Sequence, residues 1–280
     1  MSQFISLTQY QLIEVQGADA EKYLQGQLTS DVVRLASGAT TLTAHCDPKG
    51  KMNAIYRLFK VSSEQFFLLV KKDILPSGLD ALKKYAVFSK VSFDLRDWQI
   101  IGVIGEKCGK ITPNFSLEID EKRSILLNET ELPVNFNGDE KIWEVADIQA
   151  GLPNLSPQMQ NEFIPQALNL QAIEQAISFT KGCYIGQETV ARAKYRGANK
   201  RAMFIFKAQT QQEAKIGSEI EMQLEANWRK TGTITSAVNL DGVLWLQVVM
   251  NNDIDSEQQF RLLNSEILLE RVQLPYSITE

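Results

Sequence analysis

The chain has 280 residues, of which 44% are apolar and 22% charged, so it can bury one or more cores, and its length predicts about two domains. Its net charge of -5 at pH 7 excludes a uniformly basic nucleic-acid coat, so any RNA contact has to be local. The first 21 residues contain no Lys or Arg, and no apolar run approaches the roughly 18 residues of a membrane span. We therefore expect a cytoplasmic protein without a membrane partner.

Short strands and helices alternate in the first half of the chain, which indicates an α+β fold. Alternating apolar and polar residues between turns predict strands over 11–15, 40–46, 52–61, 66–70, 91–95, 99–104 and 124–127. Helical spacing predicts helices after Asp19, over 73–85 and around 168–175. The stretch 107–139 is otherwise rich in loops. Five further strands predict a small separate barrel or sandwich, at 202–207, 219–224, 231–238, 243–250 and 266–272.

The most informative segment covers residues 177–201 and reads ISFTKGCYIGQETVARAKYRGANKR. A strand over 177–179, a turn and a helix are expected in that order, which places Cys183 at or next to a helix N-terminus. Free backbone N–H groups at a helix start, together with nearby Lys181, favour a thiolate. A buried, inert cysteine explains the same spacing, and both interpretations stay open.

The same segment concentrates positive charge against an acidic background. Five cations occupy ten residues, and they are Arg192, Lys194, Arg196, Lys200 and Arg201. One interpretation is a local site for an anion. The other is a solvated helix face with interdomain ion pairs.

The remaining reactive side chains give weaker signals. Cys46, Cys108 and Cys183 lie far apart without paired spacing, so neither a disulfide framework nor a metal site is predicted. His45 is next to Cys46 on a predicted strand, where neighbouring side chains point to opposite faces. Trp143, on another expected strand, is by itself a candidate core aromatic.

Several segments together resemble one protein family. The run KGCYIGQE at 181–188 is similar to the signature of the YgfZ family, which is related to the glycine-cleavage T-protein. Further matching segments occur in the same order, at 15–32, 44–51, 163–173, 190–202, 227–233 and 247–253. Only the loop-rich stretch 107–139 is left without a match.

This resemblance implies a three-domain ring, or cloverleaf, like the aminomethyltransferase fold. A discontinuous folate-binding domain would combine residues 1–45 with 140–200. A shortened ferredoxin-like middle domain would cover 46–139, and a C-terminal β-barrel would cover 201–280.

The resemblance also implies that tetrahydrofolate, or a derivative, binds in the central channel. The family holds it with two aromatic side chains, which match Tyr10 and Trp143 here. A flat heterocycle stacks well on such rings, and cations attract its anionic glutamate tail. The further cofactor-binding candidates are Gln149, Lys181, Arg192 and Arg196. Cys183 is the candidate functional thiol, and no metal site is implied.

Two features depart from the T-protein pattern. T-proteins have adjacent aspartates in the hairpin strand, one of them catalytic, whereas Asn53 and Ala54 stand at the matching positions. Neither side chain supplies the carboxylate that helps an amine leave. Gln149 replaces the glutamate that grips the pterin, so a charge-assisted hydrogen bond is lost. Ordinary aminomethyl transfer is therefore not expected.

Three functions remain open at this point. The first is a folate-binding accessory protein that supports assembly or repair of iron–sulfur enzymes, including those that methylthiolate tRNA, with a tRNA contact at 192–201. The second is a folate-dependent one-carbon transferase acting on tRNA or protein. The third is a structural binder that has lost catalysis. Asn53 and Ala54 weigh against the second, and Cys183 weighs against the third.

Overall fold

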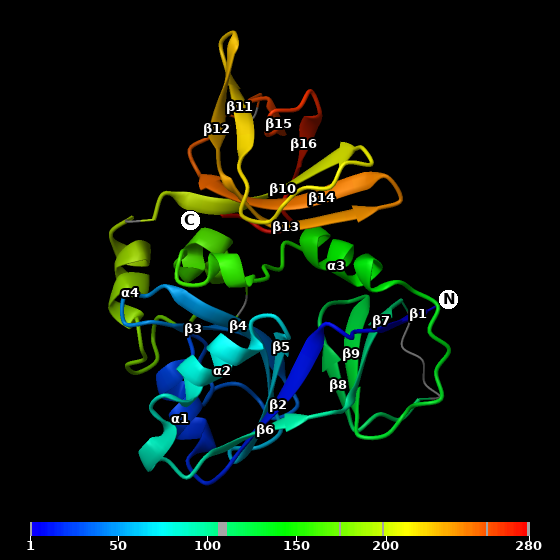
Figure 1. The fold of residues 1–280 in the computed structure, drawn as a ribbon. Coiled ribbons are helices and arrows are strands. Elements are labelled where there is room, and N and C mark those ends of the chain that lie inside the picture. Colours follow the sequence, from blue (N-terminus) through cyan, green and yellow to red (C-terminus); the bar gives the residue numbers. More distant parts are fainter. Residues whose placement is uncertain (1, 106–110, 174, 198, 256, 279–280) are drawn as a thin grey trace.

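The computed structural model describes residues 2–105, 111–173, 175–197, 199–255 and 257–278. Within these ranges the strands form three antiparallel sheets, and Figure 1 shows the C-terminal sheet above the two others, with the helix over Glu140–Gln149 beneath it. Cys108 lies outside the described residues.

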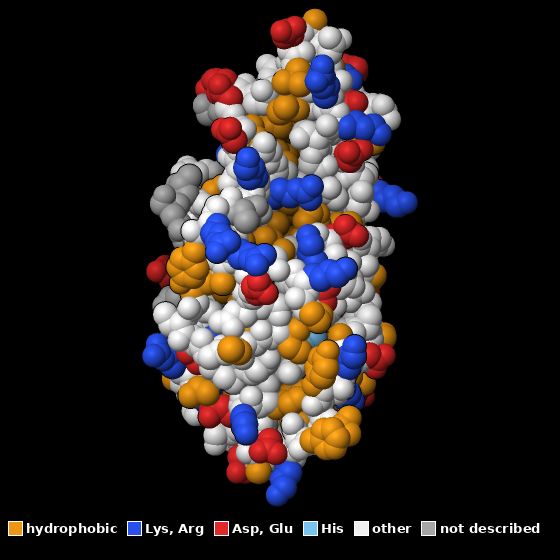
Figure 2. Space-filling model, turned by 90° about the vertical axis from the view of Figure 1, so that its left-hand side faces the viewer, with side chains coloured by type: hydrophobic (Ala, Val, Ile, Leu, Met, Phe, Trp, Pro, Cys, Tyr) orange, Lys and Arg blue, Asp and Glu red, His pale blue; other side chains and the backbone are white. Residues whose placement is uncertain are grey.

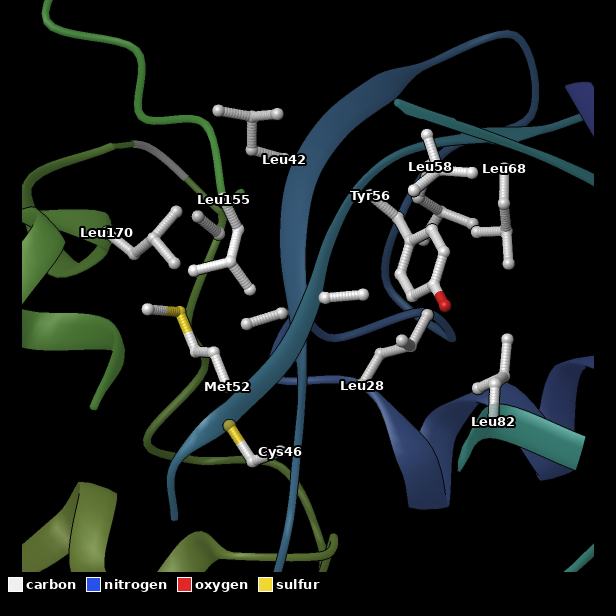
Figure 3. Close-up of a cluster of buried hydrophobic side chains, with 14 of the residues drawn as sticks. Leu28, Leu42, Cys46, Met52, Tyr56, Leu58, Leu68, Leu82, Leu155 and Leu170 are labelled. Carbon is white, nitrogen blue, oxygen red and sulfur yellow. The ribbon is translucent and has the colours of Figure 1, made fainter. Parts of the chain in front are cut away.

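The central five-stranded sheet is buried on both faces. Its strands, in spatial order, are β3 (Thr40–Cys46), β4 (Met52–Lys60), β5 (Gln65–Lys71), β2 (Tyr10–Gln16) and β6 (Ser92–Arg96). Two helices, α1 (Ala20–Gln27) and α2 (Leu75–Lys83), contribute to the core on one face. Figure 3 shows Tyr56 of β4 in this core, near Leu28 and Leu82. Phe59 belongs to a second core, which also contains Trp143.

The second sheet is smaller and connects the N-terminus to the middle of the chain. Its order is β1 (Gln3–Ser6), β7 (Gln99–Ile104), β9 (Arg123–Asn128) and β8 (Phe115–Glu118). Helix α3 (Glu140–Gln149) packs on it through Trp143, and a Cβ placed on Gly102 of β7 would lie only 2.5 Å from Cε3 of the indole. Glycine at 102 therefore makes room for Trp143.

The C-terminal sheet has seven strands around its own apolar core. In spatial order they are β12 (Asn227–Thr231), β11 (Ile220–Leu224), β15 (Phe260–Leu262), β16 (Leu268–Val272), β10 (Arg201–Gln209), β14 (Val243–Asn251) and β13 (Thr233–Leu240). The rings of Phe206 and Phe260 meet edge to face, with centroids 5.0 Å apart. The expected all-β region is confirmed, and β12 and β15 are the strands that the pattern missed.

Other expectations about local structure were wrong. Trp143 lies in α3 rather than in a strand, because Asp139 caps a helix there by accepting a hydrogen bond from the N–H of Lys141 at 2.7 Å. The expected helix around 168–175 is replaced by two short 3-10 turns, η3 (Pro165–Leu168) and η4 (Leu170–Ala172). Asn169 separates them with a left-handed φ of 59°. Residues 177–179 form no strand.

The position of Cys183 also differs from expectation. Helix α4 (Gln187–Tyr195) begins four residues after it, so Cys183 lies in the preceding loop and not at a helix start. The expected domain boundary between residues 45 and 46 falls at the end of β3, which forms a hairpin with β4.

Two glycine-containing turns fit closely against each other and fix the KGCYIGQE loop. Gly186 has φ +82°, and a Cβ there would lie 2.6 Å from the carbonyl oxygen of Asp47 and 3.0 Å from Cβ of Cys46. Gly50, in the β3–β4 turn, has φ +77°, and its Cβ would lie 2.6 Å from Cβ of Thr189. The close contact between these turns needs glycine at both positions.

Replacing Gly186 by Ala should therefore destabilise the protein by at least ~2 kcal/mol, since left-handed strain and overpacking each cost ~1–3 kcal/mol. Gly182→Ala is the matched control in the same motif, because a Cβ at 182 meets no atom within 4 Å. Urea unfolding of both variants measures the difference. Equal stability of the two variants would show that the turns do not depend on this contact.

Candidate functional site

The candidate site is a pocket between the central sheet and α3. It encloses about 530 Å³ of space not filled by atoms, including its open mouth. The walls come from β2, β3, β4, β5, β9, α3 and the segment 152–155. The polar and aromatic side chains that line it are those of Tyr10, Arg57, Lys71, Trp143, Asp147 and Asn154. The pocket therefore brings together the two predicted aromatic residues.

These two aromatic residues contribute to the pocket in different ways. Tyr10 begins β2, opposite Lys71 of β5, and its ring is partly buried. Burial, followed by the nearby charge of Asp147, raises the pKa of Tyr10 well above its ordinary value, so its hydroxyl stays protonated. Trp143 is only 2% exposed, packs on Gly102 and has Arg123 Cζ 5.3 Å from its ring centroid. Tyr10 is therefore the ring better placed for stacking, while Trp143 supports the wall.

Asp147 lies one helical turn after Trp143 and brings a buried carboxylate to the pocket. Its Oδ1 accepts a hydrogen bond from Arg123 Nη1 at 2.7 Å, and Arg123 Nε also donates to Asp120 at 2.6 Å. Burial raises the pKa of the Asp147 carboxyl, and the Arg123 guanidinium opposes that rise. Asp147 Oδ2 accepts no hydrogen bond from any residue in the described part of the chain. One acceptor atom is thus available to a ligand.

The sequence pattern did not identify Arg57 or Asp147 as site residues. Arg57 looks like an outward-facing residue of an alternating strand, as it would be if the sheet were covered on one face only. The only sign of a site in the sequence was a charged residue in the middle of a strand. That Arg57 lines a pocket follows only from the position of α3, which is distant in sequence and covers that face of the sheet.

The other predicted site residues lie away from the pocket lining. Gln149 is exposed at the end of α3. Lys181 Nζ is buried and donates hydrogen bonds to the carbonyl oxygens of Leu28 at 2.7 Å and Ser30 at 2.6 Å. Burial lowers the pKa of Lys181 to about 7. Its amine therefore ties the KGCYIGQE loop to the chain after α1 and is not a free cation beside Cys183.

Cys183 and the basic stretch occupy the outer surface. Cys183 is exposed, whereas Cys46 is fully buried and its thiol pKa is raised by burial. Four of the five cations in 192–201 are exposed, namely Arg192, Arg196, Lys200 and Arg201. Figure 2, which views the side where α4 lies, shows Lys and Arg side chains gathered across its middle. Arg192 also pairs with Glu188 along α4, as the solvated-face interpretation expects.

Asn53 and Ala54 provide no catalytic carboxylate. Asn53 Nδ2 lies 3.3 Å from Nδ1 of His45, and burial lowers the pKa of His45 to about 4, so the ring is neutral at physiological pH. Ala54 is fully buried, 3.0 Å from where a Cβ on Gly78 would lie, so a larger side chain has little room. Among the described residues no group of three or more His, Cys, Asp or Glu side chains could hold a metal ion.

The described helices include none that is both long and apolar enough to cross a membrane.

Comparison with known proteins begins with close relatives. A protein of Haemophilus influenzae is 99% identical over the whole of both chains. The tRNA-modifying protein YgfZ of Photorhabdus laumondii is 39% identical, with 99% of this chain and 93% of that protein covered. The tRNA-modifying protein YgfZ of Aliivibrio fischeri is 40% identical, with 98% of this chain and 92% of that protein covered.

Domain and structure comparisons agree with these relatives. The family model described as the YgfZ beta-barrel domain matches residues 199–265. The glycine cleavage system aminomethyltransferase T of Bartonella henselae superposes with a TM-score of 0.67 at 13% identity, covering 98% of this chain and 86% of that one. This likeness confirms the expected α+β fold of the aminomethyltransferase type with a C-terminal barrel. Because these YgfZ proteins are about 40% identical to this chain over almost the full length of both, the chain belongs to the YgfZ family.

Proposed function

We propose that this chain is a cytosolic, folate-binding protein that supports the modification of tRNA. The observation that carries the proposal is the pocket between the central sheet and α3, where Tyr10, Arg57 and Asp147 meet beside the buried Trp143. A reduced folate binds there with its pterin ring against Tyr10.

The chemistry of the pocket suits a flat heterocycle with polar edges. Its walls are largely apolar, with Leu42, Ile55 and Leu69 among the lining residues. Its few polar groups belong to aromatic and charged side chains and to one amide, Asn154. Such a combination is typical of small-molecule sites, in which apolar area supplies affinity and placed polar groups supply orientation. The fold shared with an aminomethyltransferase supports the same choice of ligand.

The proposal extends to tRNA through the names of the relatives and the outer surface. Relatives that align over nearly their whole length are named tRNA-modifying proteins. The exposed cations Arg192, Arg196, Lys200 and Arg201 give a polyanion a local point of contact on an otherwise acidic protein. Exposed Cys183 lies in the loop before α4 and is the thiol available to a partner. One of these cations, Arg192, lies in α4 itself.

An accessory role toward iron–sulfur enzymes, including those that methylthiolate tRNA, rests on the family resemblance of the KGCYIGQE segment. Aminomethyl transfer has less support, because Asn53 and buried Ala54 leave the hairpin strand without a carboxylate. Binding and support, rather than glycine cleavage, therefore account best for the described residues.

The folate proposal predicts a specific loss of affinity at Tyr10. Tyr10→Ala should weaken tetrahydrofolate binding by about 1–3 kcal/mol, the range for bases stacked on aromatic side chains. Tyr10→Phe is the matched control and should keep most of the affinity, because its ring face is unchanged. Anaerobic calorimetric titration measures both variants. Absence of binding by the wild-type protein, or equal affinity of Tyr10→Ala, would rule out this use of the pocket.

The accessory role predicts that Cys183 is needed in cells although it adds little to the fold. Because Cys183 is exposed, Cys183→Ser should unfold like the wild type in urea but restore fewer methylthiolated tRNA nucleosides when it replaces the deleted gene. Cys108→Ser is the control substitution and should restore them fully. Mass spectrometry of digested tRNA gives the readout, and full restoration by Cys183→Ser would remove the thiol from the proposal.

A further inference from the structure

Arg57 occupies an unusual place for a charged side chain. It lies in the middle of β4, and its register partners are Leu42 on β3 and Leu69 on β5. Tyr56 and Leu58, its neighbours along the strand, belong to the core on the α1 and α2 side, where Figure 3 shows them. Because strand residues alternate, Arg57 faces the other way, into the pocket.

Among the described residues, the Arg57 side chain forms no hydrogen bond and no ion pair. Other cations in the interior are fully engaged. Lys60 Nζ donates to Glu21 at 2.7 Å and also to two backbone carbonyl oxygens, and Arg123 is held by Asp120 and Asp147. Burial lowers the pKa of Arg57, and the charge of nearby Asp147 opposes that shift. By surface area the Arg57 side chain is half-buried.

A charged group in this position is unfavourable for folding alone. An apolar side chain between Leu42 and Leu69 would pack without any desolvation cost, whereas the half-buried Arg57 guanidinium loses part of its hydration and gains no hydrogen bond from the described residues. The arginine is therefore better explained by something that enters the pocket and accepts its hydrogen bonds.

The neighbouring groups restrict what that ligand can be. Asp147 is close enough to influence the pKa of Arg57, and its free Oδ2 offers an acceptor in the same pocket. Glu144, one turn earlier on α3, is paired with Lys71 at 3.0 Å. A carboxylate ligand would meet repulsion from Asp147. A neutral planar ring with a carbonyl oxygen next to N–H groups matches both side chains, since Arg57 only donates and the Asp147 carboxylate, ion-paired with Arg123 at 2.7 Å, accepts through its second oxygen.

We infer that Arg57 is the residue that selects the ligand's pterin ring, by donating hydrogen bonds to the ring carbonyl while Asp147 accepts from the adjacent ring N–H and amino groups. This inference rests on the proposed folate-binding function and adds the recognition of the ring edge. The glutamate tail then points away from Arg57.

The test compares Arg57→Met with the wild type and with Arg34→Met, a control that makes the same substitution at an exposed arginine outside the pocket lining. Two ligands are titrated, tetrahydrofolate and a tetrahydropterin that lacks the glutamate tail. Arg57→Met should bind both about 10- to 100-fold more weakly, which is the usual loss for hydrogen bonds from a charged donor. Arg34→Met should bind both as tightly as the wild type, because the Arg34 side chain is 78% exposed and does not line the pocket.

Stability separates this role from a structural one. Because Arg57 is unpaired, Arg57→Met should be at least as resistant to urea as the wild type, and Arg57→Lys, which keeps the charge but not the planar fork, should lose affinity as well. Unchanged affinity of Arg57→Met for both ligands would overturn the inference. So would a loss seen with tetrahydrofolate alone, or a clear fall in stability. A wild-type protein that binds neither ligand would instead refute the proposed function.

Discussion

The covering of the central sheet on both faces is the constraint on which the rest of the structure depends. Helices α1 and α2 fill one face with a continuous apolar core, whereas α3 approaches the other face and leaves a pocket there. Trp143 determines how close α3 lies to the sheets, because its indole packs on Gly102 of the second sheet. The pocket is thus formed where two sheets and one helix meet, and its walls are held by large buried side chains.

Two different regions of the molecule carry the two parts of the proposed function. The pocket group, Tyr10, Arg57 and Asp147, lines a pocket with an open mouth, where we propose that a small planar ligand binds. The outer group, around Cys183 and α4, is exposed, and its loop is fixed by Gly186 and by the buried amine of Lys181. The KGCYIGQE motif therefore combines residues that hold the loop with a thiol that the loop presents.

Local patterns predicted most strands and the separate C-terminal barrel, because turn residues and alternation are short-range properties. They failed where a contact distant in sequence decides the structure. Trp143 was placed on a strand although Asp139 caps a helix, and Cys183 was placed at a helix start that comes four residues later. Tyr10 and Trp143 were found through family resemblance. Arg57 and Asp147 were missed, since their roles arise only when β4 and α3 face each other across the pocket.

The central claim is that a reduced folate occupies the pocket with its pterin ring between Tyr10, Arg57 and Asp147. A crystal structure of the protein grown with tetrahydrofolate tests it most directly. The claim predicts density for a flat ring against Tyr10, with its carbonyl oxygen within hydrogen-bonding distance of the Arg57 guanidinium. A folate bound elsewhere on the protein, with this pocket holding only water, would contradict it.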